Sequence, residues 1–153
     1  MLYALAFLAG IVAGSRALTA PAAVSWAAHL GSLNLEGSWL AFMGYAWTPW
    51  VFTVLAIVEL ITDQLPSTPS RKVPMQFGAR IVTGALSGAT LGASAGSWIA
   101  GLIAGIVGAG IGTYGGAEVR ARMTKAFGRD LPAALIEDAG AIVLGLIIVW
   151  ALR

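Results

Sequence analysis

The chain has no cysteine and a single histidine, His29, among its 153 residues. Disulfides, thiolate metal sites and cysteine nucleophiles are therefore excluded, and one histidine argues against a histidine-based metal or phosphatase site. A Walker-type glycine loop is missing too, so we expect no cofactor. The formal net charge of +2 is too small to indicate nucleic-acid binding.

Charge is also scarce. Asp, Glu, Lys and Arg make up 10% of the residues, compared with about a quarter in soluble domains. Hydrophobic residues make up 58%, and the mean hydropathy is +0.84. Segments of about 20 apolar residues are long enough to cross a bilayer core of about 30 Å. The pattern predicts one domain, 1–153, that is an all-α polytopic bundle of about five membrane helices, at about 2–30, 38–63, 77–95, 97–118 and 131–152.

The first of these segments is too long for one crossing and is interrupted by Gly14-Ser15-Arg16 and Pro21. It is either one kinked helix, which puts the N-terminus inside, or a short helix followed by a second, which puts it outside. Pro49 should kink the second segment in the same way. The three prolines of the 64–75 connection, Pro66, Pro69 and Pro74, predict a stiff extended loop.

Basic residues are concentrated in two connections. Six of the nine lie in 64–75 and 119–130: Arg71, Lys72, Arg120, Arg122, Lys125 and Arg129. Positively charged loops remain in the cytoplasm, so both connections should face it in a bacterial inner (plasma) membrane. Four tryptophans, Trp26, Trp39, Trp98 and Trp150, should lie at the opposite interface as an aromatic belt.

The sequence also contains an internal similarity. Residues 14–20 resemble 78–84, and Gly-Ser-Trp-Leu-Ala at 37–41 resembles Gly-Ser-Trp-Ile-Ala at 96–100, a register that places Glu59 on Glu118. An even number of crossings separates the copies, which predicts parallel repeats. The repeat units are helical hairpins of residues 14–63 and 78–118, with an additional helix at 131–152.

Glycine is abundant, with 20 residues, and much of it recurs at spacing four in the third and fourth segments. This spacing places glycines on one helix face, where two backbones can approach closely. We expect a tight hairpin or dimer seam rather than a pore lining. The predicted packing residues are Gly84, Gly88, Gly92, Gly96, Gly101, Gly105, Gly108 and Gly112.

Charged residues within apolar segments are costly and usually face the bundle interior. The candidates are Arg16, Glu59, Asp63, Arg80, Glu137 and Asp138. We expect Arg80 to pair with Glu59 or Asp63, and Arg16 with Glu137 or Asp138. Because adjacent residues on a helix point about 100° apart, only one of the last two need face the core. The cluster is either a structural set of ion pairs or a site for an ion or small charged solute.

Three features together resemble a known family. They are Gly14-Ser15-Arg16 with Pro21, the stretch from Asp63 through Pro66 and Pro69 to Arg71, and the glycine-rich hairpin. They are similar to the small bacterial membrane proteins of domain of unknown function 4126. The resemblance covers nearly the whole chain and implies a multi-helix inner-membrane protein. It implies no activity and no catalytic residues.

Three functions fit these features. The first is a small transporter or channel, working as a homodimer because five helices leave little room for a solute path. The second is a non-catalytic membrane scaffold whose glycine faces pack against a partner's helices. The third is a lipid-modifying enzyme, although no metal or nucleophile motif supports one. A wet cavity at the charges would favour transport, a dry layer the scaffold, and a bound lipid head group the enzyme.

Overall fold

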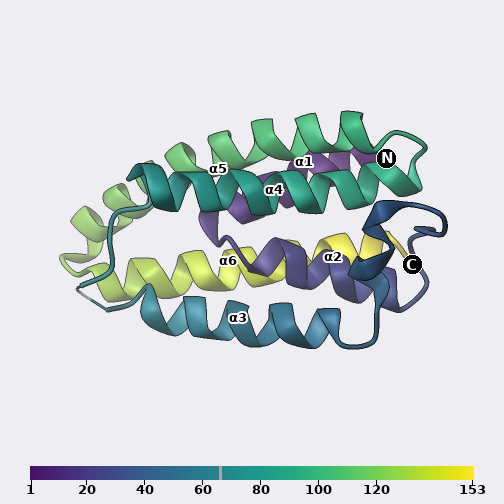
Figure 1. Cartoon of the computed structure of the whole chain (residues 1–153). Helices are drawn as coiled ribbons and strands as arrows, with labels where there is room; N and C mark the ends of the chain where they lie inside the picture. Colours follow the sequence, from purple (N-terminus) through teal and green to yellow (C-terminus); the bar gives the residue numbers. More distant parts are fainter. Residues whose placement is uncertain (66) are drawn as a thin grey trace.

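The computed structural model describes residues 1–65 and 67–153, so the prediction for Pro66 lies outside the described residues. Within these ranges the protein is all-helical (Figure 1). The elements are α1 (Leu2–Ser15), α2 (Thr19–His29), the 3-10 helix η1 (Trp39–Gly44), α3 (Thr48–Thr62), α4 (Pro74–Ser94), α5 (Trp98–Phe127) and α6 (Asp130–Ala151).

The first predicted segment is two helices. The helix α1 ends at Ser15, Arg16 has extended backbone angles, and α2 begins at Thr19. The two run in opposite directions and form a hairpin whose tip is Arg16–Leu18 (Figure 1). The N-terminus therefore lies at the end of the bundle where α2 ends, and the C-terminus, at the end of α6, lies there too (Figure 1). Of the two interpretations left open by the sequence, the structure has the broken helix.

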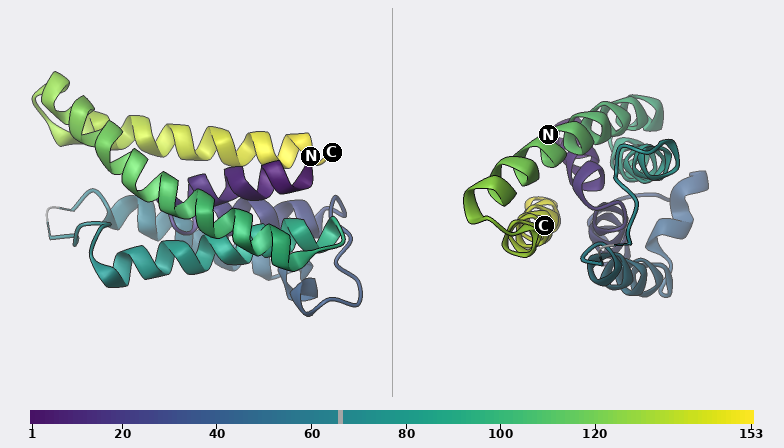
Figure 2. Two further views of the ribbon diagram at one scale, coloured as in Figure 1. Left: turned by 90° about the horizontal axis from the view of Figure 1, so that it is seen from above. Right: turned by 90° about the vertical axis from the view of Figure 1, so that its left-hand side faces the viewer.

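The helices form two layers of three. The helices α1, α4 and α5 make one layer, and α2, α3 and α6 make the other (Figures 1 and 2). Each arm of the α1–α2 hairpin belongs to a different layer. The chain crosses between the layers at the hairpin tip, which places Arg16 between them.

Glycine holds the first layer together. A Cβ atom on Gly88 would collide with the backbone of Gly101 and Gly105, and Gly84 and Gly92 approach α5 equally closely. Farther along α5, Gly108 and Gly112 contact the α1 backbone at Phe7 and Ile11, an approach shared by Gly10 and Gly14 of α1. This close packing needs residues without side chains on the facing surfaces.

Gly96, predicted to belong to the same packing face, lies elsewhere. It occupies the turn between α4 and α5 with φ +95°, and a Cβ atom there would meet nothing within 4 Å. Glycine is favoured at this position by the left-handed backbone conformation and not by a contact between helices. Although Gly96 follows Gly92 by four residues, it does not continue the packing face of α4.

Large apolar side chains lie mainly outside and small or polar ones inside. The fully buried residue with the largest side chain is Arg16, and much of the core is alanine. By contrast, Ile99, Ile103, Val107 and Ile111 form an exposed stripe along α5. A surface of this kind indicates apolar surroundings. The helices α5 and α6 are long and apolar enough to cross a membrane, whereas α1 and α3 are apolar but have 14 and 15 residues.

Two predicted boundaries are wrong. The second segment divides into η1 and α3, so Pro49 lies in the first turn of α3, where proline is tolerated and causes no kink. The 119–130 connection is mostly helix, because α5 continues to Phe127 and ends at Gly128 with φ +69°. A Glu118–Arg122 ion pair, four residues apart, supports this extension.

The Gly-Ser-Trp similarity has a common local structure. Gly37 and Gly96 both have positive φ, and the Ser38 and Ser97 hydroxyls both accept a backbone N–H of the helix that follows. The rings of Trp39 and Trp98 meet edge to face at 5.8 Å. In the other similar pair, 14–20 spans a helix break and 78–84 lies within α4. The complete repeat stays a prediction.

A leucine at Gly105 should be far more damaging than a leucine at Gly110 on the same helix. The first would collide with Gly84 and Gly88 of α4, whereas nothing lies within 4 Å of the second. We expect Gly105→Leu to lower the free energy of unfolding by more than about 3 kcal/mol, if the protein folds at all. Unfolding in mixed micelles, followed by circular dichroism, measures both variants. Equal stability of the two would contradict the glycine contact.

Candidate functional site

The α1–α2 hairpin tip is bound by charged side chains from other helices. The Glu59 carboxylate of α3 accepts hydrogen bonds from the backbone N–H groups of Ala17 and Leu18, at 2.7 and 2.8 Å. These donors precede the first residue of α2, where a helix has unpaired N–H groups and a partial positive charge. Glu59 therefore caps the start of α2 with a negative charge.

The end of α1 is capped by the opposite charge. The Nη1 atom of Arg80 on α4 donates to the carbonyl oxygens of Gly14 and Ser15, at 3.1 and 2.6 Å. These carbonyls lie at the negative end of the α1 dipole. Arg80 is only 2% exposed. The two helix ends produced by the break are thus each satisfied by a buried or half-buried ion.

Arg16 is fully buried between the layers and is surrounded by three carboxylates. Its Nε donates to Asp138 Oδ1 at 2.5 Å, its Nη1 donates to Asp63, and Glu137 lies 3.8 Å from its Nη2. Asp63 Oδ2 also lies 3.7 Å from Arg80 Nη2, and Gln64 donates to Asp138 at 3.1 Å. A buried charge needs such pairing, because desolvation without a partner is very costly.

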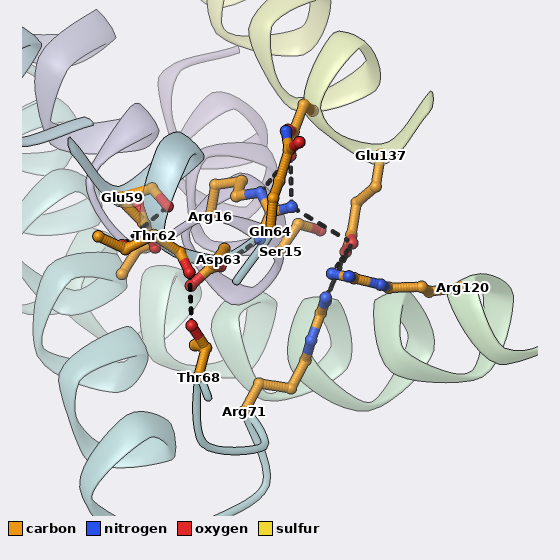
Figure 3. A network of polar contacts seen from close by, with 12 residues as sticks. Ser15, Arg16, Glu59, Thr62, Asp63, Gln64, Thr68, Arg71, Arg120 and Glu137 are labelled. Atoms are coloured by element: carbon orange, nitrogen blue, oxygen red, sulfur yellow. Dashed lines mark hydrogen bonds and ion pairs between the residues drawn. The ribbon is translucent and has the colours of Figure 1, made fainter. Parts of the chain in front are cut away.

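Two further arginines complete the cluster, Arg71 from the α3–α4 connection and Arg120 from α5 (Figure 3). Arg71 makes a two-pronged ion pair with Glu137, with 2.8 Å between Nη2 and Oε2. Arg120 lies 3.5 Å from the same carboxylate and also donates to both oxygens of Asp130, at 2.9 and 2.6 Å. In Figure 3, Arg71 and Arg120 approach Glu137 from two directions.

The structure brings all six charged residues predicted from sequence into this cluster. Arg80 lies near Asp63, and Arg16 pairs with Asp138 and lies near Glu137. Sequence reasoning missed the hydrogen bond of Gln64 to Asp138 and the ion pairs of Arg71 and Arg120 with Glu137. The two arginines lie in segments where positive charge was explained by topology alone. The available signal was the charge balance of the predicted cluster, which had four carboxylates and only two arginines. The basic residues of the connections could supply the missing positive charge.

Both carboxylates of the Glu137–Asp138 pair are engaged, although only one was required to face the core. Their different directions lead them to different cations: Asp138 meets Arg16, and Glu137 meets Arg71 and Arg120. The longer Glu137 side chain reaches toward the loop and the α5 extension. The 100° separation therefore distributes the pair over two sets of arginines.

The cluster lies within the bundle rather than at its end. At 1.5 Å per residue, Arg80 is about 9 Å along α4 from Pro74, and Asp138 is about 12 Å along α6 from Asp130. The hairpin tip ends at the same depth, because Ser15 accepts a hydrogen bond from Arg80 and Arg16 donates one to Asp138. Space therefore remains between the tip and the nearer end of the bundle.

A polar cavity of about 740 Å³ occupies this space. Its inner end is lined by Asp63 and Arg80, and its walls come from the α3–α4 connection, the α5 extension and the start of α6. The lining side chains that carry charge or a polar group are Asp63, Gln64, Thr68, Ser70, Arg71, Arg80, Arg120, Thr124, Lys125 and Asp130. The volume is in the range of small-molecule sites.

A second groove lies beyond the hairpin tip, toward the termini. It has a volume of about 380 Å³ and is lined by apolar faces of α2, α3 and α6, including Trp26, Leu60 and Leu146. Thr19, just after the tip, lines its inner end. The charge cluster therefore separates a polar cavity from an apolar groove.

In the described part of the chain, no three His, Cys, Asp or Glu side chains are placed to hold a metal ion. Comparisons with protein-family models, with curated proteins and with solved structures found no match. The resemblance to domain of unknown function 4126 thus stays a prediction from the sequence.

The glutamate cap can be tested against its counterpart in the predicted repeat. Glu59→Gln keeps one acceptor for the hairpin tip but removes a charge-assisted hydrogen bond, so we expect a loss of about 1–3 kcal/mol in unfolding free energy. Glu118→Gln, at an exposed ion pair, should have no measurable effect. Unfolding in mixed micelles gives both values. If the two variants were equally stable, Glu59 would not be holding the tip.

Proposed function

We propose that the protein is a small multi-pass membrane transporter or channel for an ion or small charged solute. In this proposal α3, α4, α5 and α6 cross the membrane, and the α1–α2 hairpin enters from the outer side and returns to it. The polar cavity opens to the cytoplasm. The single observation that carries the proposal is the charged hairpin tip at the inner end of this cavity.

The distribution of side chains supports the membrane arrangement. Exposed apolar residues cover α3, α5 and α6, and the tryptophans of η1, α5 and α6 lie toward the end that holds the termini. The opposite end carries Arg71, Arg120 and Lys125. Positive charge at one end and tryptophan at the other is the pattern of a cytoplasmic and an outer interface. This arrangement has four crossings instead of five.

The broken helix supports a role in transport. Discontinuous helices in membrane proteins place unpaired backbone groups and dipole ends where they line a solute site. Here the break lies between two layers, one sealed by glycine contacts and the other hollowed by the apolar groove. Movement of the second layer against the first would connect the cavity with the groove past Arg16. Because the cavity lies within one chain, a homodimer is not needed to form the path.

A membrane scaffold is the second candidate. It is favoured by one observation, the complete burial of Arg16 among carboxylates, which describes a dry ion-pair layer. Such a layer fixes helix register and need not move. The exposed stripe on α5 would then contact a partner helix, in a homodimer or a larger assembly. Transport and scaffold differ in whether solute crosses the charge layer.

Blocking the polar cavity tests the transport proposal. Ala121 lines the cavity, whereas Ala126 on the same helix is exposed and does not line it. Currents from proteoliposomes on a solid-supported membrane, tested with a panel of cations and anions, should exceed those of empty liposomes. Ala121→Trp should reduce them roughly tenfold or more, which corresponds to at least about 1.4 kcal/mol added to the barrier for solute passage. Ala126→Trp should not.

Two results would contradict the proposal. One is an absence of currents for every solute in the panel with a protein that is folded and inserted. The other is an equal reduction by both tryptophan variants, which would mean that the cavity is not the path.

A further inference from the structure

The transport proposal leaves the solute class open, and the charges of the cavity narrow it. Building on that proposal, we propose that the polar cavity binds a phosphate group, as free phosphate or as the monoester head group of a lipid. Arg80 at the inner end and Lys125 at the wall are the residues that bind it. Both line the cavity.

Most charges around the cavity already have partners. Arg120 and Asp130 form a two-pronged pair, Arg71 is paired with Glu137, and Asp63 is paired with Arg16. These pairs build the walls and contribute little net charge to a ligand.

Two cations differ from the rest. Lys125 is exposed and forms no ion pair within the described residues. Arg80 has only a long contact, 3.7 Å, with an Asp63 carboxylate that Arg16 already engages. Glu59 also attracts Arg80, although its carboxylate is bound to the backbone of the hairpin tip. An unpaired lysine and an arginine without a close ion pair can together balance the charge of a phosphate group, which is between −1.5 and −2 at neutral pH.

The geometry of Arg80 strengthens the match. Its Nη1 is used by the carbonyls of Gly14 and Ser15, but its Nε is buried and has no hydrogen-bond partner in the described part of the chain. The Nε and Nη2 atoms form one edge of the guanidinium, and such an edge can bind two oxygens of a phosphate side by side. Asp63 Oδ2 lies 3.7 Å from this Nη2, but its close partner is Arg16. A buried donor without a partner is costly, and a ligand that displaces the side chains covering Nε would remove that cost.

Polar donors and volume favour phosphate over a bare halide. The Ser70 oxygen accepts from the Lys72 backbone N–H, which leaves its hydroxyl proton available at the cavity. Gln64 adds an amide to the same lining. About 740 Å³ holds a phosphate together with an attached organic group.

Isothermal titration of the full-length protein in nanodiscs tests the site. The probes are inorganic phosphate and a short-chain phosphatidic acid, each compared with chloride at equal ionic strength. We expect saturable binding of at least one phosphate probe and none of chloride. Lys125→Glu should weaken it about fivefold or more, and Arg80→Lys, which keeps the charge but loses the fork, about tenfold or more. Arg153→Glu makes the same change of charge at the end of the bundle that holds the termini, outside the cavity lining, and should bind as the unchanged protein does.

Each outcome decides the proposal. Binding of inorganic phosphate identifies a free solute, binding of phosphatidic acid alone identifies a lipid head group, and both support the site. No binding of either probe, or binding that Lys125→Glu leaves unchanged, overturns it. If Arg80→Lys does not fold, the exposed Lys125→Glu variant still decides. Cation currents without phosphate binding would overturn the site but not transport, whereas phosphate binding without any current would overturn transport but not the site.

Discussion

The structure depends on the neutralisation of two helix ends inside the bundle. Breaking a helix at Arg16 leaves unpaired N–H groups at the start of α2 and unpaired carbonyls at the end of α1. Glu59 accepts the N–H groups of Ala17 and Leu18 just before α2, and Arg80 donates to the carbonyls of Gly14 and Ser15 at the end of α1. Away from water such groups cost several kcal/mol each when they lack partners. The hairpin tip can therefore lie inside the bundle only because a carboxylate and a guanidinium bind its backbone there.

The remaining architecture follows from where the hairpin ends. One arm packs by close backbone contact against α4 and α5, so its layer consists largely of glycine and alanine at the contacts. The other arm packs against α3 and α6 and leaves an apolar groove. Arg16 lies where the chain crosses between the layers, and it pairs with Asp63, directly after α3, and with Asp138 of α6. The tip leaves space toward the basic end of the bundle, and the polar cavity fills it.

The cost of burying charge explains what could be predicted from sequence. Arg16, Arg80 and their carboxylates lie in apolar segments, where each must find a partner, so their convergence was predictable. Arg71 and Arg120 lie in polar segments, where a cation needs no buried partner, so the cost of burial did not place them in the cluster and only the excess of carboxylates over arginines pointed to them. The all-helical class followed from composition. The direction of α1 did not, because a break at Gly14-Ser15-Arg16 fits a kink as well as a reversal.

Single-cysteine labelling in cells distinguishes a reversal of the chain at Arg16–Leu18 from a kink, because the protein has no cysteine of its own. Tyr3→Cys near the N-terminus, Glu36→Cys in the α2–η1 connection and Ser70→Cys in the α3–α4 connection report three exposed positions. An impermeant thiol reagent should label positions 3 and 36 from outside and position 70 only in inverted vesicles. Labelling of position 3 from the same side as position 70 would show one kinked helix and contradict the hairpin.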